Sequence, residues 1–129
     1  MRLYMTATLL LTLLCGLVAG ASAQEGFPLD GTWRGDWGPD AENRTPVVMV
    51  MKWDGSQING TINPGRNSIP FESAVLDPSN WTVHIEAATA DGTPIVIDAM
   101  LEDIGSYHRR LEGTWTEGGV ENALKIARE

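Results

Sequence analysis

Apolar and polar residues alternate with a period of two through much of the chain. In WTVHIEAA, residues 81–88, every second residue is apolar, and PIVIDAMLE, residues 94–102, follows the same rule. This alternation is typical of antiparallel strands that bury one face and leave the other in water. The segment VVMVM, residues 47–51, is apolar at every position. We expect its second face to be covered by a terminus or a partner, or to be exposed.

Turn-forming residues separate eight such segments. Asp54-Gly55, Asp91-Gly92 and similar pairs favour tight reversals. The predicted strands are Gly31–Trp37, Pro46–Trp53, Gln57–Ile62, Ile69–Leu76, Asn80–Ala88, Pro94–Glu102, Arg109–Thr116 and Val120–Ala127. Because the connections are short, consecutive strands should be antiparallel neighbours. The pattern predicts an all-β fold, an eight-stranded antiparallel up-and-down β-barrel closed by pairing between the first and last strands.

The last segment, Val120–Ala127, also fits helical spacing and contains good helix formers. Two observations favour a strand. Gly118-Gly119 precedes it as a hairpin turn, and a helix here would leave a sheet edge unpaired. We therefore expect a strand.

A Gly-Thr pair followed by a large apolar residue occurs three times, as GTW at residues 31–33 and 113–115 and as GTI at 60–62. Glycine within a β-favouring run marks a bend or a close approach of two backbones. We expect these glycines to allow the curvature of a tight barrel. The two tryptophan-bearing copies should lie near its closure.

Residues 1–23 have the pattern of a cleavable signal peptide. Arg2 precedes an apolar run, Leu9–Val18, and Ala21-Ser22-Ala23 supplies a cleavage site. This divides the chain into a signal peptide, 1–23, and one barrel domain, 24–129, and predicts a secreted or periplasmic protein. Cys15 lies inside the apolar run after Leu14, which disfavours lipidation. No stable membrane anchor is expected after cleavage, and the mature domain would contain no cysteine.

The charge balance narrows the range of partners. Nine basic residues face 17 acidic ones, a net charge of −8 that becomes −9 if Arg2 is removed with the signal peptide. Such a surface disfavours nucleic acid and anionic lipid as partners.

Candidate chemistry is sparse. The mature domain lacks cysteine, and the chain contains no Gly-x-Ser-x-Gly elbow, phosphate-binding loop or Cys-x-x-Cys pair. We therefore predict a protein that is not an enzyme and has no cofactor.

His84, Glu86 and Asp98 form the one polar cluster. The hairpin that turns at Asp91-Gly92 places either His84 or Glu86 opposite Asp98, with all three on one face. They are weak metal candidates, because the commoner outcome is an ordinary solvated His–Asp contact. We predict no metal site.

The chain contains five tryptophans, which are either core residues of a small barrel or the lining of a ligand cavity. Gly31-Thr32-Trp33 with a meander of strands behind it resembles the calycin superfamily of lipocalins and avidins. That resemblance implies a small barrel closed near Gly31, with Arg128 stacked on Trp33 as a cation–π pair. The lipocalin signature of the third major loop is absent. The opening also resembles exported bacterial Gly-x-Trp domains of unassigned function.

These observations predict an exported, non-catalytic binding protein that holds a small apolar or aromatic ligand in the barrel mouth. The candidate lining residues are Trp33, Trp37, Trp53, Trp81 and Trp115. The alternative is a protein-interaction module, such as a periplasmic protease inhibitor or an accessory domain of an exported enzyme. That alternative predicts a packed barrel and an exposed apolar patch at residues 47–51 or 24–29.

Overall fold

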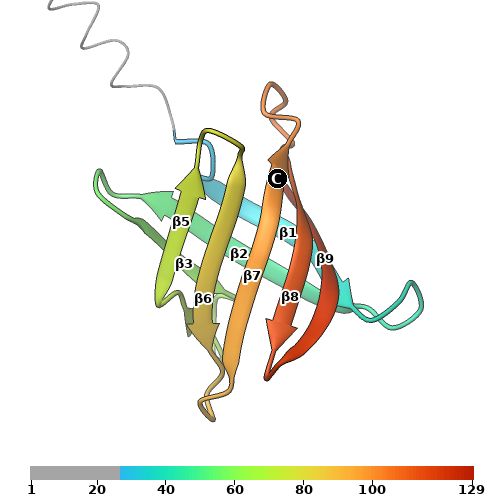
Figure 1. The fold of residues 1–129 in the computed structure, drawn as a ribbon. Helices are drawn as coiled ribbons and strands as arrows, with labels where there is room; N and C mark the ends of the chain where they lie inside the picture. The colour runs from blue at the N-terminus through green and yellow to red at the C-terminus, as the bar shows by residue number, and fades with distance from the viewer. Residues whose placement is uncertain (1–26) are drawn as a thin grey trace, which may run out of the picture.

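Residues 27–129, the part of the chain that the computed structural model describes, form one antiparallel sheet of nine strands (Figure 1). The strands are β1 (Gly31–Gly38), β2 (Thr45–Trp53), β3 (Ile58–Ile62), β4 (Ile69–Pro70), β5 (Ser73–Asp77), β6 (Thr82–Ala88), β7 (Pro94–Glu102), β8 (Arg110–Glu117) and β9 (Val120–Arg128). The predicted all-β antiparallel class is confirmed. The predicted signal peptide with Cys15, and residues 24–26, lie outside the described residues. Across 27–129 we find no helix of the length and apolarity needed to cross a membrane.

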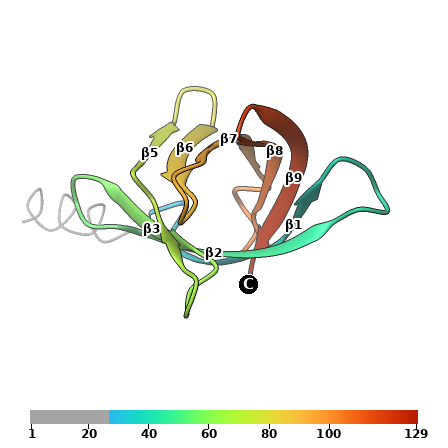
Figure 2. The ribbon, with the colours of Figure 1, turned by 90° about the horizontal axis from the view of Figure 1, so that it is seen from below.

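The sheet order is β4-β3-β2-β1-β9-β8-β7-β6-β5. The predicted pairing of the first and last strands is confirmed, from Trp33 opposite Arg128 to Gly38 opposite Ala123. Val120–Arg128 is a strand, as expected, and not a helix. Figure 2 shows the sheet curling, with β1, β2 and β3 on one side and β6 to β9 on the other.

The prediction of a closed, eight-stranded barrel is wrong: the sheet has nine strands and is an open half-barrel. The predicted strand Ile69–Leu76 is divided, because β4 pairs with β3 whereas β5 pairs with β6. The change of partner falls between two residues. Phe71 N–H donates to the Gly60 carbonyl (2.9 Å), and Glu72 N–H donates to the Glu86 carbonyl (2.8 Å). β4 and β5 are therefore the two edges of the sheet. We call the space between β3 and β5 the seam.

The concave side of the sheet carries the core. The inward side chains of the strands, with Leu29 ahead of β1, are apolar and buried, and no polar or charged residue within 27–129 is buried. The buried residues are Leu29, Trp33, Val47, Met49, Met51, Ile58, Ile62, Val83, Ile85, Ala87, Ile95, Ile97, Ala99, Leu101, Leu111, Trp115, Leu124 and Ile126. On β2 the outward Val50 is 38% exposed, so the apolar second face of residues 47–51 is partly open to solvent.

Two of the Gly-Thr glycines lie where neighbouring groups come very close. A Cβ atom added at Gly113 would lie 2.0 Å from the backbone oxygen of Asp98 on β7. At Gly60 it would lie 2.2 Å from the ring of Phe71, which covers this glycine. The contact at Gly113 is with the backbone and requires glycine on steric grounds, whereas a side chain at position 60 would have to displace the Phe71 ring. The expected close approach is thus present in strands β3 and β8.

Candidate functional site

Two of the five tryptophans are buried in the core, and the other three are half-buried against it. Trp33 is 0% and Trp115 is 3% exposed. The half-buried Trp37 stacks on Trp115, with ring centroids 4.8 Å apart and an interplanar angle of 3°. The indole N–H of Trp33 donates to the Leu29 carbonyl (2.8 Å), which satisfies both buried groups. A ligand could reach Trp33 only by displacing core side chains.

Arg128 does not form the expected stack on Trp33. The two residues are opposite each other in the β1–β9 pairing, but the guanidinium of Arg128 lies over the Tyr107 ring, 5.0 Å from its centroid. Its Nε–H donates to the Tyr107 carbonyl (2.9 Å) and its Nη1–H to the Asp30 carbonyl (3.3 Å). The Trp33 ring is fully buried, whereas Tyr107 is 68% exposed, so the guanidinium lies over Tyr107 and not over Trp33. Gly31 still faces this side chain, since a Cβ there would lie 3.1 Å from Arg128 Cδ.

Trp53 lies beside a pocket at the seam. Its ring stacks on Phe27, with centroids 4.9 Å apart and an interplanar angle of 17°. The pocket has a volume of about 360 Å³, and we call it the seam pocket. It is lined by Phe27, Trp53, Ser56, Gln57, Ile58, Ala74, Val75 and Leu76. One wall therefore comes from β5 and the other from the β2–β3 hairpin and the segment before β1.

Side-chain hydrogen bonds hold both parts of the hairpin wall. Asp54 caps the turn, because its carboxylate accepts the backbone N–H groups of Gln57 and Ser56, each at 2.9 Å. These bonds, with one from the Asn59 amide, hold the pKa of Asp54 at about 2. Asp30 accepts the backbone N–H of Trp53 (2.7 Å), which joins the segment before β1 to the end of β2. These hydrogen bonds hold the backbone on both sides of the Phe27–Trp53 stack in place.

Arg109 fixes the segment that carries Phe27. Its Nη1–H donates to the carbonyl of Pro28 (2.9 Å) and its Nε–H donates to the carbonyl of Ile104 (2.8 Å). Phe27 lies next to Pro28 in the chain, so its ring is positioned by an arginine more than 80 residues away. The sequence analysis did not single out Phe27. Its only signal was the naming of residues 24–29 as one possible exposed patch.

Trp81, the fifth candidate, lies just before β6 with a positive φ of 58°. Its ring is half-buried against the core, and its carbonyl accepts the N–H of Leu101 (2.8 Å). Trp53 lines the seam pocket and Trp81 does not. Of the five candidate tryptophans, Trp53 is therefore the one placed at this pocket.

A second hollow lies on the outward face of β5, β6, β7 and β8. It has a volume of about 340 Å³, and we call it the outer groove. It is lined by Val75, Asp77, Thr82, Val83, His84, Asp98, Ala99, Met100 and Glu112. Two apolar side chains in it face solvent, Val75 at 60% and Met100 at 48% exposure. The sequence analysis missed both, although each occupies an outward position in a strand that alternates.

His84 and Asp98 meet in this groove. Of the two registers that the sequence allowed, the structure has the one that pairs His84 with Asp98, and His84 Nδ1 lies 2.6 Å from a carboxylate oxygen of Asp98. His84 Nε2 lies 3.6 Å from Glu86 Oε2. The hydrogen bond to Asp98 raises the pKa of His84. With a carboxylate near each nitrogen, the imidazolium form is favoured, whereas a metal needs an unprotonated nitrogen. Within residues 27–129 no group of three His, Cys, Asp or Glu residues is arranged to hold a metal ion.

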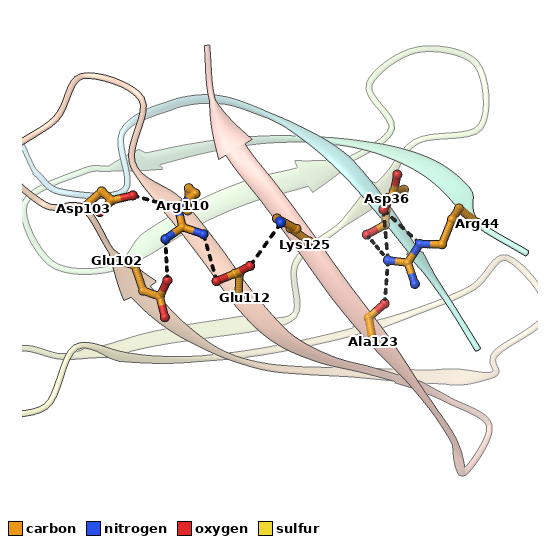
Figure 3. A network of polar contacts seen from close by, with 8 residues as sticks. All are labelled: Asp36, Arg44, Glu102, Asp103, Arg110, Glu112, Ala123 and Lys125. Carbon is orange, nitrogen blue, oxygen red and sulfur yellow. Dashed lines mark hydrogen bonds and ion pairs between the residues drawn. The ribbon is translucent and has the colours of Figure 1, made fainter. Parts of the chain in front are cut away.

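An ion-pair network continues from the groove across β7, β8 and β9 (Figure 3). Arg110 contacts three carboxylates, those of Glu102 at 2.9 Å, Asp103 at 2.7 Å and Glu112 at 3.0 Å. Lys125 Nζ lies 3.5 Å from the other oxygen of Glu112. Arg110 is thus surrounded by acidic groups, and these contacts raise its pKa, chiefly through Asp103.

The chain matches no known family model, and no similar curated protein or solved structure was found. The all-β antiparallel architecture is shown by the sheet itself.

Proposed function

We propose that this protein is an exported, non-catalytic binding protein that holds a small apolar or aromatic ligand in the seam pocket. The supporting observation is the stacked Phe27–Trp53 pair beside a pocket of about 360 Å³. Small-molecule sites are typically concave, mainly apolar and of roughly 300–1,000 Å³, with a few polar groups. Ile58 and Leu76 add aliphatic surface, while Ser56 and Gln57 supply the polar rim.

Export and a calycin-like fold belong to the same proposal. The pattern of residues 1–23 supports a secreted or periplasmic location. The opening Gly31-Thr32-Trp33 and the pairing of β1 with β9 support a likeness to lipocalins and avidins. The seam pocket lies between β3 and β5, so the proposal moves the ligand from the barrel mouth expected from the sequence to the side of the sheet.

The test is a titration of the purified protein with N-phenyl-1-naphthylamine, an apolar aromatic probe whose emission rises on burial. We expect a saturable rise in the wild type and its loss in Trp53→Ala. Trp81→Ala is the matched control, because Trp81 is also half-buried but does not line the seam pocket. No saturable change in the wild type, or equal loss in both variants, would count against the proposal.

A second, milder variant tests the proposal in case Trp53→Ala does not fold. Phe27→Leu keeps an apolar side chain and removes one aromatic ring from the pocket wall, whose contact with an aromatic probe is worth about 1 kcal/mol. We expect about fivefold weaker binding of the probe, with a circular dichroism spectrum like that of the wild type. Unchanged affinity would contradict the role given to the stack.

The second candidate function is a protein-interaction module, such as a protease inhibitor or an accessory domain of an exported enzyme. The outer groove favours it, because Val75 and Met100 are solvent-facing apolar side chains gathered in one hollow. Apolar surface of this kind marks contact sites for other molecules.

A further inference from the structure

We propose that the outer groove is a docking site for a segment of another protein that presents lysine or arginine residues beside apolar side chains. This inference rests on the second candidate function and names the chemistry of its partner. It does not depend on the seam pocket. Three properties of the groove support it: two exposed apolar side chains, an excess of carboxylates, and basic side chains that already form ion pairs.

The apolar part of the groove does not serve the fold. Val75 and Met100 both point away from the core and are 60% and 48% exposed. They lie on adjacent cross-strand rows, one running through Val75, His84 and Asp98 and the next through Thr82 and Met100. β6 lies between the two strands that carry them, so a partner segment that crosses the strands could cover both. Covering them would remove apolar surface from water, which favours binding.

The charged part of the groove is acidic. Six carboxylates lie in the groove or in the ion pairs that extend from it, against three basic side chains. The carboxylates belong to Asp77, Glu86, Asp98, Glu102, Asp103 and Glu112, and the basic side chains to His84, Arg110 and Lys125. The excess of negative charge selects a partner of positive charge.

The basic side chains on this face already form ion pairs with carboxylates. His84 lies between Asp98 and Glu86, Arg110 contacts three carboxylates, and Lys125 contacts Glu112. An acidic partner would have to displace these contacts, whereas a basic one would add to them. A second copy of this chain is a poor occupant, because each copy carries a net charge of −8 and like charges repel. The charge thus favours a basic protein segment over self-association.

The experiment uses a fluorescently labelled synthetic peptide that alternates lysine with leucine, and a matched peptide that alternates glutamate with leucine. Fluorescence anisotropy of each peptide is measured against the purified protein at low and high ionic strength. We expect saturable binding of the lysine peptide that weakens with salt, and none of the glutamate peptide. Equal binding of the two peptides, or no binding of the lysine peptide, would overturn the proposal.

Variants locate the site on the protein. Met100→Ser removes apolar surface from the groove, and we expect about fivefold weaker binding. Val120→Ser is its control, since Val120 is 64% exposed at the start of β9 and does not line the groove.

Asp77→Asn removes one groove charge and keeps a side-chain acceptor for Ser79. Glu42→Gln, in the exposed loop before β2, is its control. Equal effects of each variant and its control would show general charge attraction and refute the site.

Two further readouts separate this proposal from others. Trp53→Ala should leave peptide binding unchanged, so a failed seam pocket and a failed groove give different results. Sedimentation equilibrium detects self-association. A wild-type dimer that Met100→Ser dissociates, together with an absence of peptide binding, would assign the groove to a second copy and overturn the basic partner.

Discussion

Replacement of Gly113 by alanine tests whether the curvature of the sheet depends on the glycine of the second GTW motif. The added Cβ would lie 2.0 Å from the backbone oxygen of Asp98 and 2.6 Å from Cα of Ala99. Favourable carbon contacts begin near 3.5 Å. Because both atoms belong to the backbone of β7, no side chain can rotate away. The β7–β8 pairing would have to separate locally.

The expected cost follows from that separation. Forcing an extra methyl group into a packed site costs about 3 kcal/mol when the backbone must move. Alanine also restricts the unfolded chain, which returns roughly 0.4–1 kcal/mol of stability. The net loss in the free energy of unfolding is therefore about 2 kcal/mol. For a domain of this size, that corresponds to a fall in Tm on the order of 10 °C.

Gly105→Ala is the matched control. A Cβ at Gly105 would meet no heavy atom of residues 27–129 within 4 Å, so this variant has the unfolded-state benefit without the clash. Urea and thermal unfolding of both variants, followed by circular dichroism and tryptophan fluorescence, would give the comparison. Equal stability of the two variants would refute the steric reasoning.

Two more predictions concern buried and exposed polar contacts. The raised pKa of His84 means that its contribution to stability is present below pH about 6.5 and is lost as pH rises through its higher folded pKa. For a side chain this exposed the contribution amounts to less than about 1 kcal/mol. Asp98→Asn removes the main cause of the raised pKa but leaves Glu86, so it should reduce the pH dependence of stability in urea unfolding; an unchanged pH dependence would contradict this. Trp33→Phe removes the donor to the buried Leu29 carbonyl and should cost about 1–3 kcal/mol, more than Trp37→Phe, whose ring remains stacked; equal costs in urea unfolding would contradict the role of the hydrogen bond.

Much of the fold could be predicted because alternation fixes which face of a strand is buried. A one-residue slip between β6 and β7 would turn the apolar face of one strand to solvent, so the sequence placed His84, Glu86 and Asp98 on one face. A two-residue slip keeps the faces, so the sequence could not choose between His84 and Glu86 as the partner of Asp98. The turn at Gly118-Gly119 likewise identified Val120–Arg128 as a strand.

The division of the predicted strand at 69–76 could not be seen in the same way. Alternation is compatible with one continuous strand, whereas the change of partner at Phe71 and Glu72 depends on distances between segments far apart in sequence. The openness of the sheet follows from that single change. Local pattern therefore located the strands and left the position of the edges undetermined.

The sequence predicted which residue type would form the site but not which residues of that type would lie there. Trp53 was one of five equivalent tryptophans, and alternation could not say which of them would lie in the core and which at a pocket. Phe27 lies outside any alternating segment, so only the hydrogen bonds of Arg109 and Asp30 explain its position. The exposure of Met100 could have been inferred, since its neighbours Ala99 and Leu101 occupy the inward positions.

The position of β1 beside β9 has a consequence for how the chain folds. Every other pair of neighbouring strands in the sheet is consecutive along the chain and can form through local contacts. The β1–β9 pairing instead joins residues 85 (Gly38 and Ala123) to 95 (Trp33 and Arg128) positions apart. Closing a loop of that length costs roughly 4 kcal/mol of chain entropy. We expect two hairpin blocks, β1–β4 and β5–β9, to form early and their docking along β1 and β9 to limit the folding rate.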